Sequence, residues 1–147
     1  MTTFKRFEEM YAWQSARNLV KLIYDATKQP DFNRDFALGD QIRRAAISVM
    51  SNIAEGFGTG SDAEFVRFLG YARRSVSEAQ SQLYAALDQD YISSEKFDEI
   101  YSKANATERQ INALIGYLAR SKQRQTIKEE TAPYTLDLPD ALDLSDL

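Results

Sequence analysis

Apolar residues recur along this chain at three- and four-residue intervals, which is the spacing of helices that bury one side. The pattern predicts helices over about residues 8–28, 37–57, 62–89 and 94–123, and no stretch alternates in the way of a half-buried strand. Long helices joined by short connections pack as neighbours that run in opposite directions. The sequence therefore predicts an all-α fold, an antiparallel up-down-up-down four-helix bundle over residues 1–128.

Local signals mark the ends of these helices. Pro30 follows the first helix, and the residue before a proline avoids the helical conformation. Residues 29–36 are therefore predicted to be a loop, with Phe32 and Phe36 packed down onto the bundle. Ser93 or the serine after it is predicted to cap the last helix.

The connection after the second helix is short and rich in glycine. Gly56, Gly58 and Gly60 are predicted to stop that helix, because glycine tolerates the left-handed geometry of a C-terminal cap. Ser61 and Glu64 then have the spacing of a capping box. This motif predicts that the third helix begins near residue 62.

The first and second helices carry apolar residues on a second side as well. The core stripe of the first helix includes Trp13 and Ile23. An exposed apolar strip of such size is uncommon on a monomer, so the additional residues are predicted to form an interface between copies of the chain. These residues are Leu19, Leu22 and Ala26 in the first helix and Ile47, Met50 and Ala54 in the second.

Charge divides the chain into a body and a tail. The net charge of the 147 residues is −4, yet six of the 22 acidic residues and none of the 18 basic ones lie beyond Lys128. Residues 1–128 therefore carry a net charge of about +2, and residues 129–147 form an acidic tail rich in leucine and aspartate. The tail is either a disordered solubilising segment or a strip that docks on a basic surface of its own oligomer or of a partner.

Composition excludes several classes of site. The chain has no cysteine and no histidine, which removes the common zinc ligands, the usual nucleophile–base pairs and the Glu-x-x-His motifs of di-iron bundles. We therefore expect no catalytic residues, no metal and no cofactor, and a protein that is not an enzyme. The sequence shows no membrane span and no signal peptide, so we expect a cytoplasmic location and no membrane partner.

Arg43 and Arg44 are the first candidates for nucleic-acid binding, since guanidinium groups fit phosphates. The alternative is that they form salt bridges with Glu55 or Glu78 on neighbouring helices or subunits.

The third helix carries the other candidates. Arg67, Arg73 and Arg74 lie near Tyr71 and form the best outward-facing cluster of basic and aromatic residues. Arg74 and Glu78 are spaced as an i, i+4 ion pair, which would partly neutralise the cluster. The sequence is compatible with two interpretations of these residues, a nucleic-acid-binding site and an ordinary solvated surface.

Three phrases of the chain resemble a known family. They are FEEMYAWQSA near the start, QIRRAAISVMSNIAEGFG in the second helix and EFVRFLGYARRSVSEAQSQL in the third. The chain resembles the small four-helix bundle family named for proteins encoded in intervening sequences of 23S ribosomal RNA genes. It is also similar to the accessory variability determinant proteins of diversity-generating retroelements.

The resemblance implies a homopentameric barrel of side-by-side bundles. In the retroelement accessory proteins, a basic surface of the pentamer binds the reverse transcriptase and nucleic acid. For this chain the resemblance implies a non-catalytic oligomeric scaffold that binds RNA or RNA/DNA through basic surface residues, with a reverse transcriptase as a candidate partner. The alternative is a protein–protein adaptor or structural ring that docks through the acidic tail. Met50 stands where the family usually has proline, so the second helix is expected to be straighter here.

Overall fold

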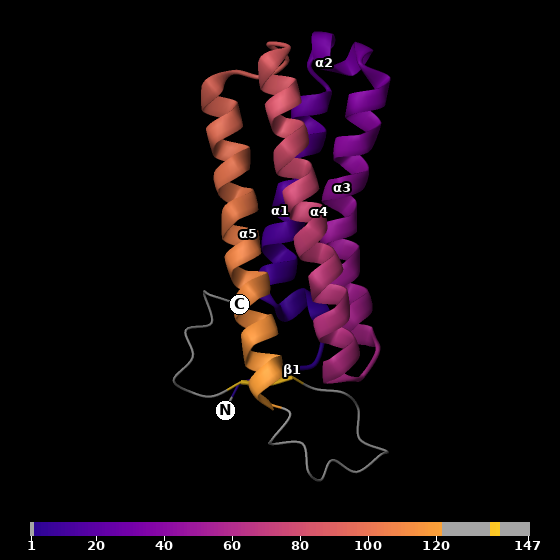
Figure 1. Cartoon of the computed structure of the whole chain (residues 1–147), viewed down its shortest axis with the longest axis vertical. Helices are drawn as coiled ribbons and strands as arrows, with labels where there is room; N and C mark the ends of the chain where they lie inside the picture. Colours follow the sequence, from indigo (N-terminus) through magenta and orange to yellow (C-terminus); the bar gives the residue numbers. More distant parts are fainter. Residues whose placement is uncertain (1, 122–135, 139–147) are drawn as a thin grey trace.

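The long helices of this chain lie side by side along one axis (Figure 1). The computed structural model describes residues 2–121 and 136–138. The long helices are α1 (Tyr11–Thr27), α3 (Phe36–Gly58), α4 (Asp62–Asp88) and α5 (Ser94–Ser121). Shorter elements are the 3₁₀ helix η1 (Phe7–Glu9), helix α2 (Pro30–Arg34) and strands β1 (Thr2–Phe4) and β2 (Leu136–Leu138). The described residues thus form a helical bundle, which confirms the helical class predicted from the apolar spacing.

The core lies between the four long helices. Helix α3 packs against α1 and α4, and α5 packs against the same two helices. Each fully buried large apolar side chain contributes about 1.5–3 kcal/mol to folding. Every long helix supplies such side chains, among them Leu19, Ile23, Ile42, Ile53, Phe65, Leu69, Leu83, Ile100, Ile111 and Leu114. No helix within the described residues is long and apolar enough to cross a membrane.

Side-chain caps fix the starts of α3, α4 and α5. The Ser61 hydroxyl accepts a hydrogen bond of 3.3 Å from the amide of Glu64, and the Ser93 hydroxyl accepts one of 3.1 Å from the amide of Lys96. Both serine caps are confirmed, whereas the reciprocal half of the capping box is replaced, since the Ser61 amide donates to the Thr59 hydroxyl. Asp35 caps α3 in the same way, accepting a 3.1 Å hydrogen bond from the amide of residue 38. The sequence analysis did not foresee this third cap.

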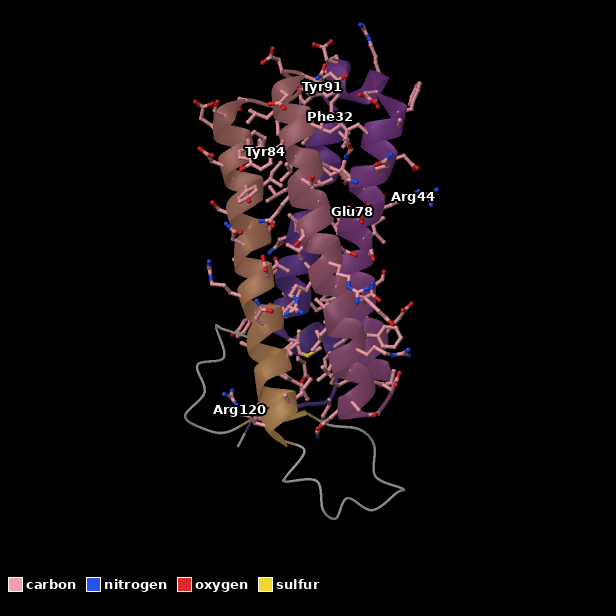
Figure 2. The ribbon with its side chains drawn as sticks, in the orientation of Figure 1. Phe32, Arg44, Glu78, Tyr84, Tyr91 and Arg120 are labelled. Carbon is pink, nitrogen blue, oxygen red and sulfur yellow. The ribbon has the colours of Figure 1, made fainter. Side chains whose placement is uncertain are left out.

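The segment over residues 29–36 differs from the predicted loop. Residues 30–34 form helix α2, because Pro30 suits the first turn of a helix, where its missing amide hydrogen costs nothing. Phe32 is buried at 1% exposure, and its ring centre lies 5.2 Å from that of Tyr91. Figure 2 labels both residues near one end of the bundle. Phe36, in contrast, is 77% exposed, so the prediction that it packs onto the bundle is wrong. It opens α3 on the side of the helix that faces away from the core.

Glycines 56 and 58 lie inside α3 and do not stop it. A Cβ atom on Gly56 would lie 2.8 Å from Cβ of Phe68 and 2.9 Å from Cδ1 of Phe65, so α3 and α4 approach each other closely here. Gly60, with φ of 71°, supplies the left-handed turn after the helix. The expectation for Gly56 is thus corrected from a helix stop to a close packing position.

A short sheet joins the two ends of the described chain. Strand β2 pairs antiparallel with β1, with Thr2 opposite Leu138 and Phe4 opposite Leu136. The sequence analysis predicted no strand. The predicted tail over residues 129–147 lies outside the described residues except for β2, and so do positions 122–123 of the predicted last helix.

Candidate nucleic-acid interface

The clearest basic and aromatic cluster lies along α4. Residues Arg67, Tyr71 and Arg74 follow each other at four- and three-residue spacing, so they lie on the same side of the helix. The guanidinium carbon of Arg67 lies 5.9 Å from the centre of the Tyr71 ring, and that of Arg74 lies 5.4 Å from it. Both arginines are exposed and Tyr71 is half-buried. The ring therefore holds two guanidinium groups at the surface in a defined arrangement, which we call the α4 cluster.

Phe68 extends this cluster on the same helix. It is half-buried, and its ring meets the Tyr71 ring edge to face at 5.8 Å and 83°. The guanidinium carbon of Arg67 also lies 5.5 Å from the Phe68 ring. A signal for this role was present in the sequence, because residue 68 adjoins residue 67 and precedes residue 71 by three positions.

One carboxylate partly neutralises the α4 cluster. Arg67 donates a hydrogen bond of 2.6 Å to Glu64, with side-chain exposures of 56% and 46%. This hydrogen bond, followed by the charge of Glu64, raises the pKa of Arg67 above its ordinary value. An exposed pair of this kind is screened by solvent and contributes little to stability, so Glu64 competes only weakly with a phosphate for Arg67.

Arg74 is not paired in the way the sequence suggested. No ion pair between Arg74 and Glu78 forms in the part of the chain that the structure describes, and Glu78 instead accepts a 3.3 Å hydrogen bond from Gln82. Figure 2 shows where Glu78 lies along α4. The charge of Arg74 is therefore available at the surface, beside the Tyr71 ring.

Arg73 does not belong to the α4 cluster. Its guanidinium donates a 3.1 Å hydrogen bond to the side-chain oxygen of Asn112 on α5. The residue therefore bridges α4 and α5, although it directly precedes Arg74 in the chain.

Arg43 and Arg44 also lie apart from the α4 cluster, and neither forms the predicted salt bridge with Glu55 or Glu78 among the described residues. Arg44 pairs with Asp40 on its own helix at 2.9 Å and projects outward from α3 (Figure 2). The guanidinium carbon of Arg43 lies 5.8 Å from the ring centre of Tyr24, which places it against α1. Of the six predicted binding residues, the structure thus brings together Arg67, Tyr71 and Arg74.

The residues predicted to form an interface are buried to different extents on α1 and α3. Leu19 is 0% exposed and Ala26 is also buried, so both pack in the core of their own chain. The expectation for these two residues is corrected, because almost none of their surface is left for another subunit. Leu22 is half-buried.

The α3 strip keeps an outward face. Ile47 is 38% exposed, and Met50 and Ala54 are half-buried. Phe36 lies eleven positions before Ile47, which brings the two residues to nearly the same side of the helix. We call Phe36, Ile47, Met50 and Ala54 the α3 strip.

Other sites in the described residues fit a polyanion or a metal less well. A cavity of about 460 Å³ near α2 and the turn before α5 is lined by Asp25, Asp31 and Asp90, with Lys96 as its basic residue. Its acidic lining disfavours phosphate. Within residues 2–121 and 136–138, no group of three or more Asp or Glu side chains is placed to hold a metal ion.

Comparison with known proteins identifies a family that matches the sequence and a solved structure with a similar fold. Residues 8–113 match the family described as 23S rRNA-intervening sequence protein. A crystal structure of a protein with unknown function, from the S23 ribosomal protein family of Bacteroides thetaiotaomicron VPI-5482, shares 20% sequence identity and a TM-score of 0.65. That similarity covers 71% of this chain and 97% of the other, and it concerns the fold alone. No curated protein matches the chain. The family match spans most of the sequence, and the chain belongs to the 23S rRNA-intervening sequence protein family.

Proposed function

We propose that this protein is a non-catalytic oligomeric scaffold that binds nucleic acid, RNA or RNA/DNA, through the α4 cluster. The observation that carries the proposal is the arrangement of Arg67 and Arg74 on the ring of Tyr71. The family name, which refers to an intervening sequence of ribosomal RNA, is consistent with an RNA-related role. By analogy with retroelement accessory proteins, the partner enzyme is a reverse transcriptase.

The cluster suits phosphate chemistry. A guanidinium group that contacts an aromatic ring through its face can still donate the N–H groups at its own edge to phosphate oxygens. Contacts of this kind supply affinity without sequence preference, and they weaken as salt rises. The scaffold is therefore expected to recognise the backbone of the nucleic acid.

The proposal includes the assembly. In this proposal the helical bundle is an antiparallel four-helix bundle, and copies of it associate side by side into a homopentameric ring. The α3 strip supports this part, because Phe36 and Ile47 expose large apolar side chains on one side of α3 and Met50 and Ala54 continue that side half-buried, and apolar surface of this kind is costly on an isolated chain. Within a ring, the positive charges of the α4 clusters of all copies would act together on one nucleic-acid strand.

Charge reversal tests the binding proposal. Arg67→Glu with Arg74→Glu should weaken RNA binding strongly, as measured by fluorescence anisotropy, because four units of charge change at the site. The matched control is Arg109→Glu with Arg120→Glu, an equal change on exposed positions of α5, the second of which Figure 2 labels. Equal loss in both variants would show that only net charge matters and would overturn the assignment to the α4 cluster.

A second candidate is a protein–protein adaptor or structural ring with the acidic tail as its docking element. The pairing of β2 with β1 favours it, since part of the tail already docks on a strand of the chain. Under this alternative the Arg67→Glu, Arg74→Glu variant would retain partner binding, and the wild-type protein would leave RNA unbound at low salt.

A further inference from the structure

A second basic and aromatic surface lies on α1, far along the chain from the α4 cluster. A groove of about 520 Å³ is lined by Glu8, Trp13, Gln14, Arg17, Asn18 and Lys21. The α1 residues form two rows at four-residue spacing, one through 13, 17 and 21 and the other through 14 and 18. All of them except Trp13, which is half-buried, are exposed. We call this surface the α1 groove.

Trp13 is held in place at one end of the α1 groove. Its ring lies 5.1 Å from that of Phe7 in η1. The guanidinium carbon of Arg17 lies 5.7 Å from the centre of the same ring. The sequence analysis assigned Trp13 to the core stripe, whereas the structure leaves part of its indole at the surface, beside a cation.

The positive charges of the α1 groove are unpaired. Neither Arg17 nor Lys21 forms an ion pair with any described residue. The nearby carboxylate of Glu8 is occupied by Arg6, so it does not cancel them. In this respect the α1 groove differs from the α4 cluster, where Glu64 engages an arginine.

The second row of the α1 groove supplies amides. Gln14 donates a 2.9 Å hydrogen bond from its side-chain nitrogen to the backbone carbonyl of Glu8, which fixes the amide and leaves its oxygen as an acceptor. Asn18 lies one helical turn further along and is exposed. Side-chain amides are the groups that hydrogen-bond to the edges of bases.

We infer that the α1 groove is a second nucleic-acid site and that it takes a single strand. Trp13 would stack on an unpaired base, Arg17 and Lys21 would contact successive phosphates, and Gln14 and Asn18 would face base edges. A ring can stack only on a base that is not already covered by its neighbours, which favours a single strand over a duplex. The inference rests on the proposed function and deepens it, because it names the strand class and a surface separate from α4.

The single tryptophan of the chain makes the test direct. Full-length protein is titrated with a fluorescein-labelled single-stranded RNA of mixed sequence, and with the same RNA annealed to its complement. Indole fluorescence reports contact at Trp13, while the anisotropy of the label reports binding anywhere on the protein. The variant is Arg17→Gln with Lys21→Gln, and its matched control is Arg109→Gln with Arg120→Gln on α5.

The inference predicts that the single strand quenches indole fluorescence in parallel with the rise in anisotropy, and that the duplex quenches it little. The Arg17→Gln, Lys21→Gln variant should bind the single strand roughly tenfold more weakly, and its log–log salt slope should fall by about 1.4, for two lost phosphate contacts. The α5 control should match wild type.

Three results would overturn the inference. A rise in anisotropy with no quenching and no effect of the Arg17→Gln, Lys21→Gln variant would remove the α1 groove and leave the α4 proposal standing. Equal quenching by duplex and single strand would refute the assignment to a single strand. No rise in anisotropy with either RNA would overturn the proposed function and the α1 groove together.

Discussion

The hydroxyl of Tyr91 donates a hydrogen bond of 3.0 Å to the carboxylate of Asp35, joining the turn before α5 to the start of α3. The other carboxylate oxygen of Asp35 accepts from the amide of Leu38 and caps α3. Phe32 of α2 stacks on the same tyrosine. The Asp35 carboxylate thus connects α3 to the turn before α5, and the Tyr91 ring extends this connection to α2 at the end of the bundle that Figure 2 marks with Phe32 and Tyr91.

The stability of this end depends on the Tyr91 proton. The hydrogen bond to Asp35, followed by desolvation and the charges of Asp35 and Asp31, raises the pKa of Tyr91 above its ordinary value of 10.0. The folded chain then holds the proton more tightly than the unfolded chain does. The contribution to stability is therefore complete below about pH 10 and is lost as the pH rises through the raised pKa.

Tyr91→Phe should have a lower melting temperature than wild type at pH 7, and the difference should shrink above about pH 10, where wild type loses the interaction as well. Thermal unfolding at both pH values checks this. A difference between the two proteins that stays constant across the range would show that the hydrogen bond is not its source.

The two roles of Asp35 can be separated by substitution. Asp35→Ala should lower the free energy of unfolding by about 1 kcal/mol for the lost cap, and further for the unpaired Tyr91 hydroxyl. Asp35→Asn keeps an acceptor oxygen, so it should cost clearly less. Urea denaturation of both variants measures the two values. Equal losses would mean that the negative charge, rather than the cap, stabilises α3.

The close approach of α3 and α4 predicts opposite effects for two glycines. Gly56→Ala should lower the free energy of unfolding by about 1–3 kcal/mol, because the new methyl group would overlap Phe65 and Phe68. A Cβ atom on Gly70 in α4 would meet no neighbouring atom within 4 Å. Gly70→Ala should therefore raise the free energy of unfolding by about 0.5–1 kcal/mol, since alanine is the better helix former. Loss of stability in both variants would argue against specific contact at Gly56.

The proposed ring predicts a mass that depends on the α3 strip. Wild-type protein should show an oligomeric mass by light scattering at micromolar concentration, and Ile47→Glu should reduce it to that of a monomer while the circular dichroism of the helices is kept. Tyr84→Glu is the matched control, because Tyr84 is another exposed large apolar residue, on α4 (Figure 2). A monomeric wild type, or equal dissociation by both variants, would contradict the proposed interface.

Helical periodicity predicted most of this fold because it depends on local spacing. The caps at Ser61 and Ser93 follow from short motifs and are confirmed. The role of Gly56 could not be predicted, because a close approach between helices is a property of two elements. The strand β2 was missed for the same reason, since its pairing with β1 joins opposite ends of the chain.

The candidate site was predictable in part. Periodicity shows which residues share a side of a helix, but it does not show which sides the chain itself covers. Leu19 therefore looked like an interface residue and is a core residue, while Trp13 looked like a core residue and is partly exposed. The α4 cluster could be predicted from the spacing of its arginines and tyrosine within one helix. The hydrogen bond from Arg73 to Asn112 could not, because it depends on where α5 lies relative to α4.

The measurement that tests the central claim most directly is the binding of RNA to the full-length wild-type protein by fluorescence anisotropy across a series of salt concentrations. Binding through guanidinium–phosphate contacts predicts affinity that is high at low salt and falls with a log–log slope of about −0.7 to −0.9 per phosphate contact. Absence of binding at the lowest salt, or affinity that does not change with salt, would contradict the account and make the adaptor alternative the leading one.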